Sequence, residues 1–145
     1  MPSKLRKLPS TLTTWKKWKK RFPRTEVLSL DTGFTRDYSR DPYENYYKRK
    51  EGFFAFLRGG PVKDEKRLVV GVTIDSAAKA YPVDVLRKRG IVTDRLGNKK
   101  IRLTVDERTD ALTVTDAKGR EIPHIIVFWF VWKDFNPESE MFESP

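Results

Sequence analysis

Apolar and polar positions in the middle of the chain follow the period of β-strands. Residues 67–74 form an almost continuous apolar run, and residues 78–83 form a second run after a turn at Asp75 and Ser76. In residues 101–106 apolar and polar side chains alternate strictly. A period of two is typical of a strand, and two runs separated by a short turn predict a hairpin. We therefore expect a hairpin over residues 67–83 and a half-buried strand over residues 101–106.

The pattern continues with shorter elements on both sides of that strand. Residues 83–89 predict a short helix, and Gly90 follows at a position that favours a left-handed cap. Residues 111–116 predict another strand, and a turn around Lys118 and Gly119 leads to a last short strand that completes a meander. The sequence thus predicts an α+β fold with a small antiparallel sheet of about five strands, covered by helices.

The four Trp lie in two stretches, residues 14–28 and 128–142, that align without a gap. In each stretch two Trp lie three residues apart, and a Pro follows five residues after the second Trp. Such a match within one chain is typical of duplicated structure. The matched positions are Trp15 and Trp129, Trp18 and Trp132, Pro23 and Pro137, Thr25 and Ser139, Glu26 and Glu140, and Leu28 and Phe142.

The first stretch predicts an amphipathic helix, because Trp15, Trp18 and Phe22 fall on one helical face and Pro23 ends the helix. The second stretch has the composition of a strand, but its match to the first predicts a helix over residues 129–135. Aromatic residues at helical spacing are more often part of a core than of an exposed binding surface. We therefore expect both helices to cover the sheet and all four Trp to seal one hydrophobic interior. The candidates for the N-cap of the first helix are Ser10, Thr11 and Thr13.

The net charge of +10 is concentrated at one end of the chain. Residues 1–24 contain nine Lys and Arg and no Asp or Glu, so the remainder is close to neutral. A cationic segment is typical of a solvated helix face, which we favour, or of a surface that binds phosphates, an anionic membrane or an acidic partner. Nucleic-acid binding is thus an alternative function. Its candidate residues are Lys16, Lys17, Lys19, Lys20 and Arg21.

The stretch from residue 29 to residue 64 has neither a helical nor a strand period. A connection of this length in a compact domain is usually functional or held by its own contacts. In one interpretation Arg36 and Arg40 pair with nearby carboxylates, lower their pKa values and brace the loop. In the other, one of these Arg binds an anionic ligand and Tyr side chains stack beside it. The candidate ligand-binding residues are Asp31, Arg36, Asp37, Tyr38, Arg40, Asp41 and Tyr43.

Composition limits the chemistry that we expect. The chain has no Cys and a single His, His124, which argues against disulfides, thiolate metal sites and His clusters. We interpret Asp106, Glu107 and Asp110 as an acidic turn rather than a calcium loop. We expect no catalytic residue, no metal and no cofactor, and an enzyme of unknown reaction is a further alternative. The longest apolar run, residues 125–132, is too short to cross a bilayer, and the sequence leaves the compartment open, with the cytoplasm as the default.

Four stretches in the same order resemble domain-of-unknown-function family 3179: LPSTLTTWKKWKKRFP, DTGFTRDYSRDPY, VVGVTIDSAAKAYPVDVL and VFWFVWKDFNPESEMF, within residues 8–142. The resemblance implies two related halves in longer, often exported members, which leaves an exported or envelope location open for this chain. This chain would be the C-terminal half together with the closing helix of the preceding half. No activity is implied. The Cys-Pro-x-x-Cys-like segment of the longer members has no counterpart here, so no thiol role carries over.

Together these patterns predict one domain over residues 1–145. It comprises a basic arm (1–9), a first helix and strand (10–28), a long ordered loop (29–64), and the sheet core with its closing helix (65–145). We expect a binding or structural module that uses the loop from Asp31 to Tyr43. Its partner would be an anionic small molecule or another protein.

Overall fold

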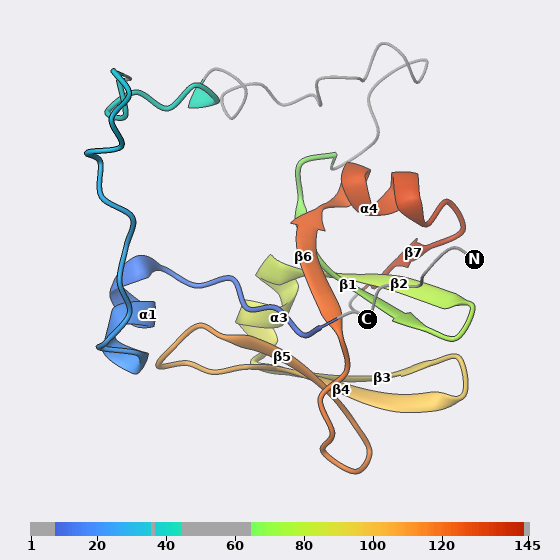
Figure 1. The fold of residues 1–145 in the computed structure, drawn as a ribbon. Helices are drawn as coiled ribbons and strands as arrows, with labels where there is room; N and C mark the ends of the chain where they lie inside the picture. Colours follow the sequence, from blue (N-terminus) through green and yellow to red (C-terminus); the bar gives the residue numbers. More distant parts are fainter. Residues whose placement is uncertain (1–7, 36, 45–64, 144–145) are drawn as a thin grey trace, which may run out of the picture.

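The computed structural model of the chain describes residues 8–35, 37–44 and 65–143 (Figure 1). Within these ranges seven strands form two sheets, one in the order β6-β1-β2-β7 and one in the order β3-β4-β5. The predicted α+β class is confirmed, and the division of the strands into two sheets is the feature that periodicity did not indicate. The elements are α1 (Trp15–Arg21), β1 (Leu68–Ile74), β2 (Ala77–Pro82), α3 (Val83–Arg89), β3 (Ile91–Leu96), β4 (Lys99–Val105), β5 (Leu112–Asp116), β6 (His124–Phe128), α4 (Trp129–Phe135) and β7 (Glu140–Met141).

The four-stranded sheet is built around β1, which pairs antiparallel with β2 and with β6. Val69, Val70 and Val72 of β1 have no exposed surface. A strand buried on both faces reads as a continuous apolar run, which explains the pattern of residues 67–74. The short strand β7 joins β2 in parallel, with Lys79 opposite Glu140 and Ala80 opposite Met141.

The three-stranded sheet is an antiparallel meander that packs against one face of the first sheet. Gly97, with positive φ, lies in the β3–β4 turn, and Gly119, also with positive φ, lies in the turn that follows β5. Gly90 caps α3 with φ 70° as the sequence predicted. The main core lies between the two sheets and α3. Its buried members are Val70, Val72, Ile74, Tyr81, Val83, Leu86, Val92, Leu96, Ile101, Leu103, Leu112 and Val114.

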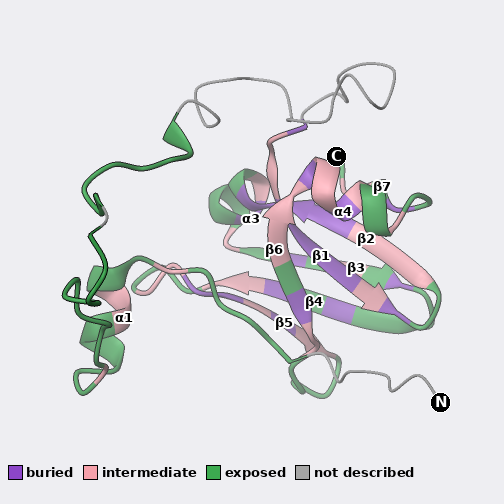
Figure 2. Ribbon diagram, turned by 45° about the horizontal axis from the view of Figure 1, so that its top comes forward, coloured by how far each residue is buried: buried purple, intermediate pink, exposed green. Residues whose placement is uncertain are grey.

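Helix α4 contacts the four-stranded sheet and lies beside it in Figures 1 and 2. Its residues Trp129 and Trp132 are buried and form a second cluster with Val69 and Ala80. The helix predicted over residues 129–135 is therefore confirmed, against the strand-like composition of this stretch. The tertiary contact of the indole rings outweighs local β propensity.

Helix α1 does not cover a sheet, and the prediction that all four Trp seal one interior is wrong for this helix. It has no buried residue, and the Trp15 side chain is 51% exposed. Its N-cap is Thr14, whose hydroxyl accepts from the Lys17 N–H, rather than one of the three predicted residues. Position explains the exposure, because α4 packs against the four-stranded sheet while α1 lies at the tip of the β4–β5 hairpin (Figure 1).

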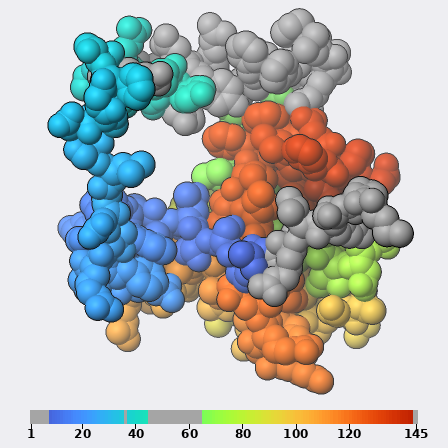
Figure 3. Space-filling view, viewed as in Figure 1, coloured from blue at the N-terminus to red at the C-terminus, as the bar shows by residue number. Residues whose placement is uncertain are grey.

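Residues 22–35 and 37–44 run from α1 along one side of the molecule without a strand (Figure 1). Thr25 is the one half-buried residue of these two ranges, and the others are exposed. Figure 3 shows open space between this stretch and the sheets. The predicted strand before residue 28 is therefore absent from the described chain. Most of the predicted ordered loop, residues 45–64, lies outside the described residues, as do Arg36 and residues 1–7.

Candidate functional site

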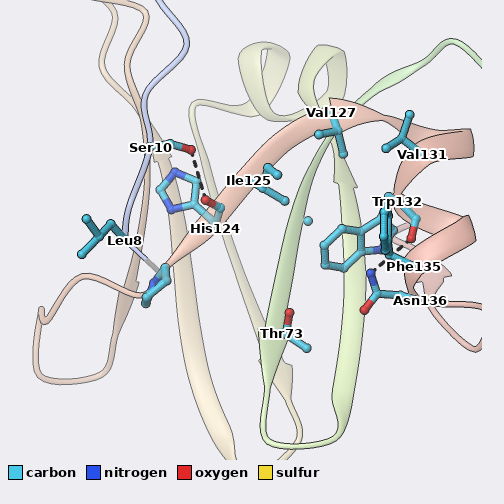
Figure 4. A pocket seen from close by; sticks show the side chains of 12 residues that line it. Leu8, Ser10, Thr73, His124, Ile125, Val127, Val131, Trp132, Phe135 and Asn136 are labelled. Carbon is cyan, nitrogen blue, oxygen red and sulfur yellow. Dashed lines mark hydrogen bonds between the residues drawn. The ribbon is translucent and has the colours of Figure 1, made fainter. Parts of the chain in front are cut away.

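A groove of about 630 Å³ opens between α4, β1 and β6 (Figure 4). Gly71 of β1 and its register partner Ile125 of β6 lie side by side in the sheet, and Trp132 of α4 lies over Gly71. Sequence reasoning missed this groove, and the signal that could have found it is the single glycine within the apolar run of β1. The remaining lining residues are Leu8, Ser10, Thr73, Pro123, His124, Val131, Phe135 and Asn136.

The indole ring of Trp132 lies against the backbone of Gly71, and a Cβ built on Gly71 would overlap that ring. Glycine permits this close approach because it has no side chain. The indole Nε1–H donates to Ser139 Oγ at 2.6 Å, and Ser139 is itself buried. Helix α4 and the bond to Ser139, which follows the turn at Pro137, therefore hold the indole ring in one orientation.

His124 contributes a buried polar group to the end of this groove. Its Nδ1 lies 3.0 Å from the Ile122 carbonyl oxygen, and its Nε2 is buried without a partner among the described residues. In Figure 4 the imidazole lies on the Ser10 side of β6, away from Trp132. The groove is lined mostly by apolar side chains, and its other polar side chains are Ser10, Thr73 and Asn136.

The stretch Trp15–Leu28, which we call the outer segment, makes the same local hydrogen bonds as Trp129–Phe142, which we call the closing segment. Trp18 Nε1–H donates to Thr25 Oγ1 at 3.1 Å, as Trp132 does to Ser139. Lys19 Nζ donates to the Thr25 carbonyl at 2.7 Å, and the matched lysine of the closing segment donates to the Ser139 carbonyl at 2.9 Å. The two helices are both seven residues long and end two residues before Pro, and in each the N–H of the C-cap residue donates to the carbonyl of the second Trp.

The two segments differ in what surrounds them. In the closing segment both Trp are buried, whereas in the outer segment Trp15 is exposed, Val27 is 66% exposed and Leu28 is 94% exposed. The outer segment contacts the β4–β5 turn, where Lys17 lies 4.0 Å from Asp110, and just before the segment Thr13 Oγ1 donates to the Thr109 carbonyl. Trp15, Val27 and Leu28 are thus left in solvent, whereas Trp18 is half-buried.

The described residues of the predicted ligand-binding loop are all exposed. Asp37, Arg40 and Asp41 line one shallow pocket of about 450 Å³ together with Pro42 and Glu44. The Tyr38 hydroxyl bonds Thr32 Oγ1 at 2.9 Å, and the Asp31 N–H donates to Ser29 Oγ. The structure therefore brings three of the seven predicted residues to one pocket. Asp31, Tyr38 and Tyr43 do not line it, and Arg36 lies outside the described residues.

The carboxylates of this loop bond to the loop's own backbone. Asp37 Oδ1 accepts from the Ser39 hydroxyl and N–H, and Asp41 Oδ1 accepts from the Tyr43 N–H. Within the described ranges Arg40 forms no ion pair with either carboxylate. The pKa of Asp37 is lowered as predicted, but the Ser39 hydroxyl and backbone N–H are the main cause rather than an arginine.

The five basic residues proposed for nucleic acid all belong to α1. Lys16, Lys20 and Arg21 are exposed and form no ion pair with a described residue, whereas Lys17 faces Asp110. Lys19 is tied to the Thr25 carbonyl and lies 5.8 Å from the centre of the Trp15 ring. Three unpaired cations therefore remain on this short helix.

A polar cluster that sequence reasoning missed links the two sheets. Asp94 Oδ2 of β3 accepts from Lys79 Nζ at 2.8 Å and from the Tyr81 hydroxyl at 2.9 Å. Burial would raise the pKa of Asp94, but these bonds and one from the Arg95 N–H outweigh it and lower that pKa. Burial, together with the Asp94 carboxylate, raises the pKa of Tyr81. Opposite charges saturate each other here, which is typical of a structural contact.

Two of the three carboxylates of the acidic turn, those of Asp106 and Asp110, are also bonded within the chain. Asp106 accepts from the N–H groups of Arg108 and Thr109, and Asp110 binds the Arg87 guanidinium with a shortest distance of 2.7 Å. Within the described part of the chain no group of three or more metal-binding side chains comes together. Nor does any described helix have the length and hydrophobicity to span a membrane.

A comparison with models of known families identifies the family of this chain. The family described as "Protein of unknown function (DUF3179)" matches residues 1–121, so the chain belongs to this family. The match includes α1, the loop and both sheets up to β5, and it ends before β6 and the closing segment. No curated protein and no solved structure matched the chain.

Proposed function

We propose that this protein is a non-catalytic protein-binding module whose docking element is the outer segment. The observation that supports the proposal most is the pair of matched segments with opposite burial. The closing segment buries its Trp pair on a sheet, while the outer segment presents Trp15, Val27 and Leu28 to solvent. Exposed aromatic residues on a surface rimmed by polar groups are typical of interaction sites.

The loop from Asp31 to Tyr43 continues directly from the outer segment and would extend the same binding surface. Its exposed Arg40 and Tyr43 suit contacts at the polar rim of an interface. The proposal also agrees with the two-half organisation that the family resemblance implies. In that organisation the outer segment and the closing segment are two copies of one structural unit, and the chain corresponds to the C-terminal half of longer members.

The test compares the proteins bound by the wild-type chain with those bound by a variant that lacks the exposed apolar side chains of the outer segment. A variant with Trp15→Ser and Leu28→Ser should lose its partner, whereas Ile91→Ser, which alters an equally exposed apolar residue on β3, should keep it. Cross-linking identifies the partner, and titration calorimetry with the purified partner measures the loss. Equal binding by all three chains would contradict the proposal.

A second candidate function is supported by the three unpaired cations of α1. In this alternative Lys16, Lys20 and Arg21 bind a phosphate backbone. Binding of a single-stranded DNA oligonucleotide should then fall steeply between about 50 and 200 mM salt, because counterions are released. A variant with all three residues changed to Gln should bind far more weakly. No retardation of the wild-type chain at low salt would dismiss this alternative.

A further inference from the structure

The closing segment makes three kinds of contact with the sheet that receives it. Trp132 fills the space above Gly71, and Trp129 packs with Val69 and Ala80. The strand β7 then pairs in parallel with the edge of β2. Finally the Phe142 N–H donates to the Ala80 carbonyl at 2.7 Å, and its ring lies 5.4 Å from the Tyr81 ring.

The outer segment carries suitable side chains at each of these contact positions. Trp15 and Trp18 match the two buried indoles, and Glu26 with Val27 matches the two residues of β7. Leu28 matches Phe142 in an apolar position. In this structure the backbone of residues 26–28 forms no strand, so its peptide groups remain open to pairing with the edge of another sheet.

We infer that the occupant of the outer segment is a second sheet of the same build, with a glycine beneath Trp18 and an edge strand that pairs with Glu26 and Val27. This inference rests on the proposed function and names the partner class. The sheet β6-β1-β2 of this chain does not serve, because its own closing segment already fills it. The outer segment therefore closes a different domain by the contacts that the closing segment makes here.

Basic residues of α1 stand where α4 has apolar residues, and this difference indicates the charge of the partner's contact surface. Phe130 and Val131 of α4 correspond to Lys16 and Lys17 of α1, and Phe135 corresponds to Arg21. Val131 lines the apolar groove beside β6. Val131 is half-buried and Ile125 is exposed here, so the matched lysines would lie at the rim of the contact. The partner's sheet would present carboxylates where β6 presents Ile125 and Val127, because complementary charges at a rim favour the right partner.

The experiment is a replacement within the full chain. The sequence Trp15–Leu28 is copied into the place of Trp129–Phe142, and thermal unfolding is followed by circular dichroism. A second chimera restores Phe and Val at the copied positions of Lys16 and Lys17, so that only the inferred contacts are tested. The matched control is the second chimera with Ala at the copied position of Trp18.

We expect the second chimera to unfold cooperatively with a midpoint within about 10 °C of the wild-type protein, a shift of a few kcal/mol for a chain of this size. We expect the first chimera to be less stable than the second, because its copied lysines lack acidic neighbours. The Ala control should lose the cooperative transition, as Trp132→Ala should in the parent chain.

If the second chimera is no more stable than a chimera that carries a scrambled copy of Trp15–Leu28, the partner is not a sheet of this build. That result would overturn the inference and leave the proposed function standing, since α1 could still dock on a surface of another kind. Equal stability of the first and second chimeras would overturn the inferred acidic rim. Loss of binding by the Trp15 and Leu28 variant is measured independently of either result.

Discussion

The ring of Trp132 rests on the backbone of Gly71, so that at this point the indole is the only side chain between helix α4 and the backbone of strand β1. This contact fixes the distance of α4 from the four-stranded sheet and forms one wall of the groove beside β6. It also explains why β1 contains a glycine in the middle of an otherwise apolar strand, where glycine is intrinsically unfavourable.

Replacement of Gly71 by Ala should destabilise the protein, because the added methyl group overlaps the indole ring. Overpacking of this kind costs about 1–3 kcal/mol, and urea denaturation measures the loss. In a Trp132→Ala background the same substitution should be tolerated, since the ring is gone. An equal cost in both backgrounds would show that the contact is not the reason for the glycine.

The bond between Trp132 and Ser139 should be worth more than its match in the outer segment. Ser139→Ala leaves a buried indole N–H without an acceptor, which costs about 1–3 kcal/mol. Thr25→Ala breaks the bond of Trp18 at a half-exposed site, where water can replace the hydroxyl, and should change stability by less than about 0.5 kcal/mol. Chemical denaturation of the two variants provides the comparison. Similar losses would mean that the outer segment is as well buried as the closing segment.

The bonds of Asp94 should make stability depend on pH in the acid range. Because the pKa of Asp94 is lowered in the folded state, its contribution is complete above the ordinary value of 3.8 and is lost as pH falls through the folded value. Asp94→Asn should therefore be less stable than wild type at pH 7, by about 1–3 kcal/mol for bonds to a charged group. The difference should shrink below pH 3.8, which thermal scans across pH would reveal. A constant difference at all pH values would contradict this assignment.

The loop from Asp31 to Tyr43 should contribute little to global stability. Its described hydrogen bonds are local, and its described residues are exposed. Arg40→Ala and Asp37→Asn should therefore leave the midpoint of thermal unfolding unchanged. Arg87→Ala, which breaks a 2.7 Å pair with Asp110, is the control that should lower it. A clear loss of stability in Arg40→Ala would favour a brace over a binding surface.

The same loop offers a local test of the pKa of Asp37. The Ser39 hydroxyl and N–H stabilise its carboxylate form, so the pKa is lowered. Ser39→Ala removes the hydroxyl bond and should raise the pKa towards its ordinary value, as followed by an NMR titration of the Asp37 carboxyl carbon. An unchanged titration would indicate another source of the shift.

The sequence predicted best those elements whose local signals agree with their tertiary surroundings. The helix Val83–Arg89 and its cap at Gly90 follow from composition alone. The helix Trp129–Phe135 was found only because its Trp and Pro spacing matches that of the first helix. The strand β6, just before it, went unrecognised because its Ile and Val were read as part of the same stretch.

Burial of the two Trp pairs could not be predicted, because it depends on which sheet each segment reaches. Local bonds such as Trp18 to Thr25 and Trp132 to Ser139 are the same in both segments. What differs is the presence of Gly71 beneath one ring, a contact between residues far apart in the sequence. The pairs predicted for Arg40 are absent among the described residues for a related reason, since nearby N–H groups of the loop bond the carboxylates of Asp37 and Asp41.

Hydrogen exchange of the four indole N–H groups, followed by NMR on the isolated chain, tests the central claim most directly. The account predicts that the Trp132 indole proton exchanges slowly, because it is buried and bonded to Ser139. The indole protons of Trp15 and Trp18 should exchange far faster, because the outer segment is not seated on a sheet. Protection of Trp18 equal to that of Trp132 would contradict the claim that this segment awaits a partner.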